Sequence, residues 1–345
     1  MSSSTTRFWQ ATVPEERPEW SEERVRQASS YWQSKILLTA LRLDLFTVLA
    51  DQALSAAALA TRLGAAERGL TILLDALVAL GLLVKQDHHY ANTPFASTAL
   101  DRSKPSFCGY MPLFDAHCWE LWGRLEDTIR SGSCPGQDTL FQADPVGTEL
   151  LLRGLHADAL RLAPALAARL DLGRRRRGRQ CRLLDLGGGA GTYAIAFCQA
   201  HPGLTAVLFD LPGPLALAQT MVSAAGLTDR ISLIAGDFRT DALPRGFDLA
   251  LLSNVLHGQS TETNQRILAE VYNALEPEGE LILRDVLMNE DRTSPAFGAL
   301  FTVNLLLHSA AGRCYTFGEV RGWLTEVGFR DLEVLEANAV LRAFR

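Results

Sequence analysis

The sequence lacks several features that would assign it to a special class of proteins. No window reaches 18 uninterrupted apolar residues, so no membrane span is expected. The first residues carry no apolar signal core, so we expect no secretory leader. The six cysteines show no CxxC spacing, which indicates reduced thiols and a cytoplasmic protein. Nothing in the sequence indicates a metal site.

An excess of basic charge is also missing. The chain has 33 Lys and Arg residues against 39 Asp and Glu, which gives a formal net charge of −6. An acidic chain has no electrostatic reason to bind phosphate backbones or anionic membranes. The one dense basic run, at 174–179, lacks interleaved aromatic residues and is interpreted as a solvated linker. We therefore expect no nucleic-acid partner and no membrane partner.

The chain is long and apolar enough to form two domains. It has 345 residues, 48% of them hydrophobic, which allows a sizeable core. Residues 1–20 contain two prolines and adjacent glutamates, and we predict a flexible arm there. From Ser21 to about Ala50 the apolar residues recur at helical spacing. Helical patterns return from about 107 and end with an Ala/Leu-rich helix from His156 to Leu170.

Between these helical stretches the pattern is typical of a winged helix. The predicted elements are helices 54–63 and 67–80, followed by strands 82–84 and 90–93. Gly64 and Gly81 stand where the two helices should end. Two helices followed by a hairpin form a winged-helix plan. The helices around 25–49 and 67–83 carry more apolar residues than so small a unit can bury, so residues 21–172 are predicted to form a homodimerisation domain.

The remaining residues, 173–345, alternate between strand and helix patterns. The predicted strands are 182–186, 206–209, 231–235, 249–253 and 280–284, and the predicted helices are 191–201, 213–225, 261–275 and 316–327. This alternation predicts a doubly wound α/β domain, with a parallel sheet and helices on both faces. The boundary between the two domains is placed near 172–180.

The strongest motif is LLDLGGGAGTYAIAF at 183–197. A buried strand leads through Asp185 into a turn that contains Gly187 and Gly189, and a helix follows. Ligands bind beyond the carboxyl ends of the strands in such sheets, so the turn is in the right place for a cofactor. Gly189, Gly191 and Ala194 also fit a relaxed dinucleotide fingerprint. An NAD-dependent oxidoreductase is therefore one alternative.

The residues at the next two strand ends favour a different cofactor. Asp210 ends the second strand and can accept hydrogen bonds from both ribose hydroxyls. Asp237 and Phe238 follow the third strand, where a carboxylate can bind an adenine amino group and a ring can pack on the base. Asp185 stands where a dinucleotide site usually has an apolar residue, and the turn has no basic residue. S-adenosylmethionine has cationic centres and no phosphates, so it suits this acidic site.

With these motifs in place, the chain resembles class I S-adenosylmethionine-dependent small-molecule O-methyltransferases. That family includes plant caffeate-type, acetylserotonin-type and bacterial polyketide-tailoring enzymes. The segments LLDLGGGAGTYA, LFDLP, GDF and LEPEGELIL carry the resemblance, which extends from about residue 30 to the C-terminus. It implies S-adenosylmethionine as cofactor, an intertwined dimer formed by the N-terminal half, and Gly187 and Gly189 along the methionine part. The predicted cofactor-binding residues are Asp185, Gly187, Gly189, Asp210, Leu211, Gly236, Asp237, Phe238 and Ser253.

The resemblance also implies a catalytic histidine. His257 lies in SNVLHGQS after the fourth strand, where the family has a general base, although Gly258 and Gln259 replace the usual Asp-Trp. Asp285 matches an acid that orients this histidine. Cys314 stands where a second acid is usual, so either Asp285 alone orients His257 or the mechanism departs from the family. Ser253 matches a position that is often basic and contacts the cofactor, so that contact is weaker here.

Further residues are candidates for the wall of an acceptor pocket. Phe297, Phe301, Leu305 and His308 recur at helical spacing, and each is as consistent with ordinary core. The predicted reaction is methyl transfer to a hydroxyl of a small acceptor. Transfer to nitrogen, carbon or sulfur, or loss of methyl transfer, is the main alternative. A DNA-binding regulator is less favoured, because helix 67–80 is mainly apolar and has too few basic residues to meet phosphates.

Overall fold

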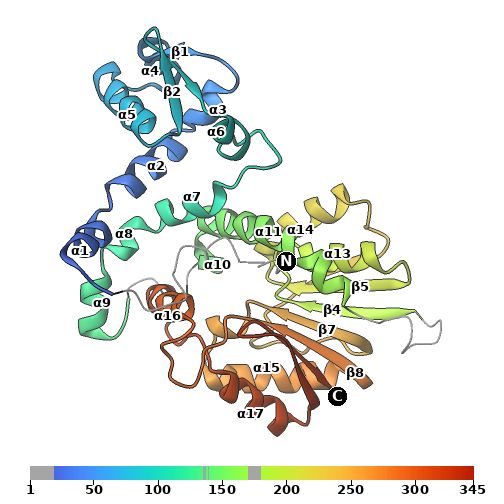
Figure 1. Cartoon of the computed structure of the whole chain (residues 1–345). Coiled ribbons are helices and arrows are strands. Elements are labelled where there is room, and N and C mark those ends of the chain that lie inside the picture. The colour runs from blue at the N-terminus through green and yellow to red at the C-terminus, as the bar shows by residue number, and fades with distance from the viewer. Residues whose placement is uncertain (1–18, 135–136, 139, 170–179) are drawn as a thin grey trace. The chain divides into compact units, whose positions relative to one another are not determined.

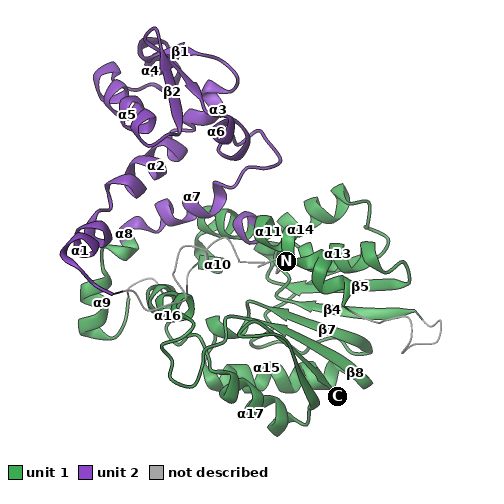
Figure 2. Cartoon of the chain, in the orientation of Figure 1, with its two compact units in different colours: residues 1–17, 121–152, 156–345 green, residues 18–120, 153–155 purple. Residues whose placement is uncertain are grey.

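The computed structural model describes residues 19–134, 137–138, 140–169 and 180–345. These residues form two compact units (Figure 2). One comprises residues 19–120 with 153–155, and the other comprises the described residues of 121–152 and 156–345. The predicted arm, basic linker and domain boundary fall almost entirely outside the described residues, so they stay predictions.

The first unit begins with three helices where the pattern predicted a helical stretch from Ser21 to about Ala50. These are α1 (Glu22–Ser29), α2 (Trp32–Arg42) and α3 (Leu45–Leu49). The run is interrupted before α3 by Asp44, whose φ of 55° is left-handed. A left-handed residue cannot continue a right-handed helix, and hydrophobic periodicity does not report it.

The winged-helix prediction is confirmed. Helices α4 (Ala56–Leu63) and α5 (Glu67–Ala79) are followed by strands β2 (Leu83–Gln86) and β3 (His89–Asn92). Gly64 and Gly81 follow the two helices with φ values of 63° and 73°, which glycine adopts readily. The short strand β1 (Leu54–Ser55) adds a third member to the sheet, in the order β1-β3-β2. The next helices are α6 (Pro94–Ala99), α7 (Tyr110–His117) and α8 (Trp119–Trp122).

The second unit contains helices α9 (Leu125–Ser131), α10 (Leu140–Ala143) and the greater part of the long helix α11 (Pro145–Ala168). Helix α11 begins eleven residues before the predicted His156. Pro145 fits the first turn of a helix, and the Asp144 carboxylate accepts a hydrogen bond from the Gly147 nitrogen at 2.9 Å.

A seven-stranded sheet forms the centre of this unit (Figure 1). Its strands are β4 (Cys181–Leu186), β5 (Leu204–Asp210), β6 (Ile231–Ala235), β7 (Phe247–Ser253), β8 (Leu275–Arg284), β9 (Arg330–Glu336) and β10 (Val340–Phe344). The order is β6-β5-β4-β7-β8-β10-β9. The five predicted strands are confirmed and run parallel, whereas β9 and β10 were not predicted and pair antiparallel. The sheet is therefore mixed rather than purely parallel.

Helices cover both faces of the sheet, so the doubly wound class is confirmed. They are α13 (Thr192–Ala200), α14 (Pro212–Ala224), α15 (Thr261–Ala274) and α17 (Phe317–Val327). A further helix, α16 (Ala296–His308), packs in a separate small cluster with residues that follow β8. Residues of α11 and α13 pack on one face, and residues of α15 and α17 pack on the other (Figure 1). The carboxyl ends of β4 to β8 meet at one edge, and the strand order reverses between β4 and β7. Ligands of such sheets bind at this switch point.

None of the helices in the described ranges has the length and apolar content that crossing a membrane requires.

Candidate functional site

A tight glycine turn connects β4 to α13. Gly187 and Gly191 adopt φ values of 66° and 76°, which side chains of L-residues rarely allow. A Cβ atom at Gly187 would lie 3.0 Å from the Val255 side chain and 3.3 Å from the Phe238 ring. The turn therefore presents bare backbone at the carboxyl end of the sheet, as the sequence predicted.

Asp185 lies directly before this turn and is almost fully buried, with 1% of its surface exposed. Its Oδ2 atom is buried and accepts no hydrogen bond among the described residues. Burial, with a smaller contribution from the charge of Asp210, raises the pKa of this carboxyl to about 7, against one backbone hydrogen bond from Ala194 that lowers it. An unsatisfied carboxylate oxygen of this kind suits a cationic ligand group.

Asp210, at the end of β5, holds the glycine turn through hydrogen bonds. Its Oδ2 accepts from the Gly189 nitrogen at 2.8 Å, and its Oδ1 accepts from the Leu211 nitrogen at 2.7 Å. Burial raises its pKa to about 6, although these two hydrogen bonds lower it. A carboxylate has about four acceptor positions, so two remain for a pair of ligand hydroxyls.

Asp237 has a partner that the sequence analysis missed. The guanidinium of Arg239 pairs with its carboxylate at 2.8 Å, and this hydrogen bonding lowers the pKa of Asp237. The Phe238 ring is half-buried against the core and lies over the glycine turn. Gly236 must lack a side chain, because a Cβ there would overlap the ring of Phe209. The adenine contacts predicted for Asp237 and Phe238 stay predictions.

The donor set at this edge fits S-adenosylmethionine. Three aspartates stand at or just beyond the ends of β4, β5 and β6, and a half-buried aromatic ring accompanies them. Only one of the three, Asp237, pairs with a basic side chain in the described part of the chain. Bare backbone, acceptors for ribose hydroxyls and an unsatisfied carboxylate match an adenosine that carries a sulfonium and an ammonium group.

His257 and Asp285 come together although 28 residues separate them. Asp285 Oδ1 lies 2.6 Å from His257 Nδ1, while Oδ2 accepts from the Leu256 nitrogen at 2.9 Å. Burial alone raises the pKa of Asp285, but His257 and the hydrogen bonds outweigh it, so the pKa lies below its ordinary value. Asp285 is thus an ionised carboxylate that accepts a hydrogen bond from the Nδ1–H group of His257. Within the described part of the chain, nothing hydrogen-bonds to His257 Nε2.

Three further side chains, which the sequence did not predict, fix the 3-10 turn that carries His257 (Leu256–Gly258). The Asn264 amide donates to the Leu256 carbonyl at 3.0 Å, and the Ser309 hydroxyl donates to the Gly258 carbonyl at 3.1 Å. The Tyr315 hydroxyl donates to the Gln259 carbonyl at 2.5 Å. These polar residues come from α15 and from the segment after α16, so only the fold shows where they point.

Cys314 cannot act as the missing second acid. It is buried, and burial together with the nearby Asp285 charge raises the pKa of its thiol to about 12. The thiol is therefore neutral at physiological pH. Asp285 is the only one of the two family positions that carries a negative charge.

The predicted pocket residues lie on α16 and differ in exposure. The Phe301 ring meets the His257 ring edge-to-face at a centroid distance of 5.1 Å, and Phe297 stacks on Phe301 at 5.6 Å. Leu305 is buried in a small core cluster. His308 is partly buried, and burial lowers its pKa. Phe301 thus contacts His257 and Phe297 contacts Phe301, whereas Leu305 lies in the core.

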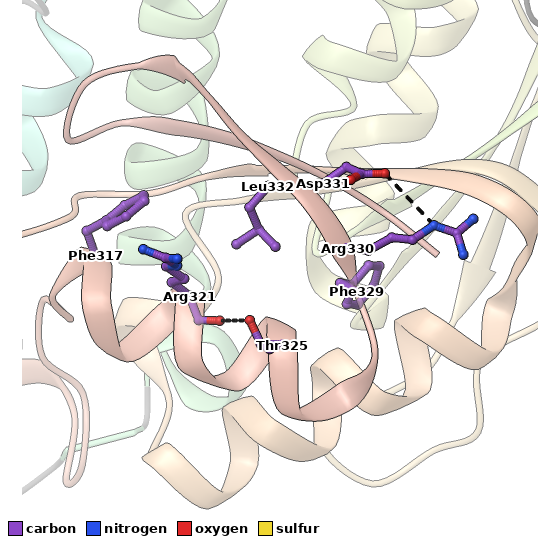
Figure 3. Close-up of a pocket in the computed structure, with 7 residues that line it drawn as sticks. All are labelled: Phe317, Arg321, Thr325, Phe329, Arg330, Asp331 and Leu332. Carbon is purple, nitrogen blue, oxygen red and sulfur yellow. Dashed lines mark hydrogen bonds and ion pairs between the residues drawn. The ribbon is translucent and has the colours of Figure 1, made fainter.

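A surface pocket elsewhere in this unit is separate from the site (Figure 3). It is lined by Phe317, Arg321, Thr325, Phe329, Arg330, Asp331 and Leu332. These residues belong to α17, to β9 and to the turn between them, and none is a predicted site residue. The ion pair between Arg330 and Asp331 and the hydrogen bond from Thr325 to the Arg321 carbonyl lie within it (Figure 3).

Comparison with known proteins gives a consistent result. A family model for the O-methyltransferase domain matches residues 175–330, and one for the O-methyltransferase dimerisation domain matches residues 25–102. The tetracenomycin polyketide synthesis 8-O-methyltransferase of Streptomyces glaucescens is 36% identical over 309 residues, which cover 88% of this chain and 89% of that protein. The 3-hydroxy-5-methyl-1-naphthoate 3-O-methyltransferase of Streptomyces sahachiroi is 34% identical, with 89% of each chain covered.

Solved structures agree. Human N-acetylserotonin methyltransferase in complex with S-adenosylmethionine superposes with a TM-score of 0.80 at 25% identity, covering 96% of this chain and 99% of that chain.

Proposed function

Because the chain belongs to the S-adenosylmethionine-dependent O-methyltransferases, we propose that it methylates a hydroxyl of a small aromatic acceptor with His257 as general base. The pairing of His257 Nδ1 with Asp285 at 2.6 Å carries this proposal. One of the two Streptomyces relatives is an O-methyltransferase of tetracenomycin polyketide synthesis, and the other is an O-methyltransferase of a hydroxynaphthoate. The acceptor of this chain is proposed to belong to the same chemical class.

The hydrogen bond to Asp285 determines which ring nitrogen of the neutral His257 carries the hydrogen. An ionised Asp285 accepts only, so Nδ1 of the neutral imidazole carries the hydrogen and Nε2 carries the lone pair. Nε2 is the atom that would take the proton of the acceptor hydroxyl. Asp285 would then stabilise the imidazolium that forms, as the carboxylate does in hydrolase triads.

S-adenosylmethionine, when bound, supplies a methyl group on a positively charged sulfur. The residues of the chain would hold it by the acids at the ends of β4, β5 and β6, with Gly187 and Gly189 beside the methionine part. His257 would remove the acceptor proton as its oxygen becomes the nucleophile. Holding the acceptor in line with the methyl group would supply much of the acceleration.

Aromatic side chains beside the base favour an aromatic acceptor. Phe301 meets the His257 ring, and Phe297 stacks on Phe301 at an interplanar angle of 12°. Flat rings prefer stacked or edge-to-face neighbours, so this row can hold a planar acceptor beside Nε2.

We also propose that the chain works as a homodimer. The residues matched by the dimerisation model, 25–102, expose several large apolar side chains. These are Val25, Tyr31, Trp32, Ile72, Val84 and Phe95. Exposed apolar surface on this scale is typical of an interface.

Mass spectrometry tests the reaction. The purified protein is incubated with S-adenosylmethionine carrying a trideuterated methyl group and with a panel of hydroxynaphthoates, other phenols and an extract of the host. Deuterated methyl ethers are expected, and the Asp210→Ala variant serves as a control with impaired cofactor binding. Label found only on nitrogen, carbon or sulfur would contradict the proposed reaction.

A further inference from the structure

Arg284 is a buried cation at the carboxyl end of β8. Only 6% of its surface is exposed. It directly precedes Asp285, and successive residues of a strand point to opposite faces of the sheet. Asp285 holds His257, whereas Arg284 lies beside the ring of Tyr193 from α13, with its guanidinium carbon 5.8 Å from the ring centroid.

The partners of Arg284 are all neutral. Its Nη1 atom donates to the Ser253 hydroxyl at 3.3 Å and to the Asn254 side-chain oxygen at 3.0 Å. A guanidinium has five N–H donors, and no carboxylate in the described ranges forms an ion pair with Arg284. A buried charge without an opposite charge is unfavourable, so this position calls for an anion.

The strand register places Arg284 on the cofactor side of the site. Arg284 lies opposite Ser253 across β7 and β8, and Asp185 lies opposite Leu251 across β4 and β7. Leu251 and Ser253 are two residues apart and share one face, so Asp185 and Arg284 share it too. Two buried and opposite charges therefore flank β7 on the same face, one carboxylate and one guanidinium, with no salt bridge between them.

We propose that Arg284 binds the carboxylate of the cofactor's amino-acid end. This inference rests on the cofactor site proposed above and names a residue for one part of it. The amino-acid end is zwitterionic, and its carboxylate is the only anionic group of S-adenosylmethionine. With the ammonium on the Asp185 side, the carboxylate falls on the side of Arg284, whose unused donors can bind it in a bidentate manner.

Calorimetry with two cofactor analogues tests the role of Arg284. S-adenosylhomocysteine has the amino-acid end, and 5′-methylthioadenosine lacks it. Arg284→Met, which keeps the length of the side chain but removes its charge, is expected to raise the Kd of S-adenosylhomocysteine at least about tenfold. The Kd of 5′-methylthioadenosine should stay within about twofold, because adenosine binding does not involve the guanidinium.

Two matched variants distinguish the loss of the Arg284 charge from a general effect on folding. Arg182→Met removes a cation from the opposite end of the same sheet, where Arg182 donates to the Gly246 carbonyl at 3.0 Å, and it should alter neither Kd. Arg284→Lys keeps the charge and should lose less affinity for S-adenosylhomocysteine than Arg284→Met. If Arg284→Met does not fold, the wild-type protein can be measured with the carboxamide of S-adenosylhomocysteine, which should bind at least about tenfold more weakly than the acid.

Three results would overturn the proposal. If Arg284→Met raises the Kd of both ligands equally, Arg284 only supports the backbone at Ser253 and Asn254. Unchanged affinity for both ligands would remove it from the cofactor site. If Arg284→Met binds S-adenosylhomocysteine as the wild type does but binds a carboxylated phenol more weakly, Arg284 binds a carboxylate of the acceptor and not that of the cofactor. Failure of the wild-type protein to bind S-adenosylhomocysteine would instead contradict the proposed function itself.

Discussion

The Oδ2 atom of Asp210 lies 2.8 Å from the backbone nitrogen of Gly189. The carboxylate predicted to bind the ribose therefore also fixes the turn that faces the methionine part. One residue at the end of β5 would therefore link two parts of the proposed cofactor site.

This link gives the first prediction. Asp210→Ala removes an acceptor for two hydroxyls and releases the Gly189 nitrogen, so the Kd for S-adenosylhomocysteine should rise at least about tenfold, given roughly 1.5–3 kcal/mol per hydrogen bond to a charged group. Calorimetry measures the Kd. Asp229→Ala, at an exposed aspartate before β6, is the control and should bind as the wild type does. Wild-type affinity in Asp210→Ala would exclude Asp210 from the site.

The second prediction concerns pH and Asp185. Its pKa is raised to about 7 by burial, above the value of about 3.9 expected in the unfolded chain. The folded protein thus binds the Asp185 proton more tightly than the unfolded chain does. The contribution of protonated Asp185 to the free energy of unfolding is therefore greatest at low pH and is lost as the pH rises through about 7. Asp185→Asn carries no charge there, and ligand-free Asp185→Asn should melt above wild type at pH 8.

Calorimetry of the two ligand-free proteins between pH 4 and 8 checks this. The difference in Tm should be at least a few degrees at pH 8, because raising the pKa from about 3.9 to about 7 corresponds to more than about 1 kcal/mol, and about 1 kcal/mol shifts a domain of this size by roughly 2–4 °C. It should shrink toward zero near pH 4. A difference that does not change with pH would mean that Asp185 is not the buried charge responsible.

The third prediction separates Asp285 from Cys314. Asp285→Asn removes the charge that fixes the His257 tautomer, so kcat should fall at least about tenfold, less than on loss of a base worth roughly 10²–10⁴. Cys314→Ser should keep kcat within about twofold, because the buried thiol is neutral. Steady-state kinetics on the identified acceptor provide both values. A larger loss in Cys314→Ser than in Asp285→Asn would reverse the assignment.

The fourth prediction is the oligomeric state. If the exposed apolar residues of 25–102 form an interface, light scattering at micromolar concentration should give twice the chain mass of 37.7 kDa. Trp32, which is 70% exposed, is a suitable probe. Trp32→Glu should shift the equilibrium toward monomer without lowering the thermal stability of the sheet domain. A wild-type mass of one chain would contradict the dimer.

The parallel core and the turns around it could be predicted because their signals are local. Strands β4, β5 and β7 and the second half of β8 are runs of mostly buried residues, β6 is a short, largely apolar run, and the helices between them begin and end near turn formers. Strand β9 gave no such signal, because it is an exposed edge strand with charged residues such as Arg330, Asp331 and Glu333. Strand β10 is short and is defined by its pairing with β8 and β9, which a local pattern does not contain.

The site residues also divide into those with a local sequence signal and those without one. Asp185, Asp210 and His257 could be found because each lies at or just after the carboxyl end of a strand, in a recognisable motif. Arg239, Asn264 and Arg284 were missed because their roles depend on partners elsewhere in the fold, namely Asp237, the Leu256 carbonyl and the Ser253 hydroxyl. A polar residue in a helix or at a strand end has no sequence signal that names its partner.

The turnover of His257→Ala on the identified acceptor tests the central claim most directly. Calorimetry with S-adenosylhomocysteine serves as the control for an intact cofactor site. The account predicts a fall in kcat of at least about a hundredfold, from the loss of general-base assistance, with the cofactor Kd near that of the wild type. If His257→Ala keeps most of its turnover, His257 is not the base, and the enzyme works by proximity on an acceptor that is already nucleophilic.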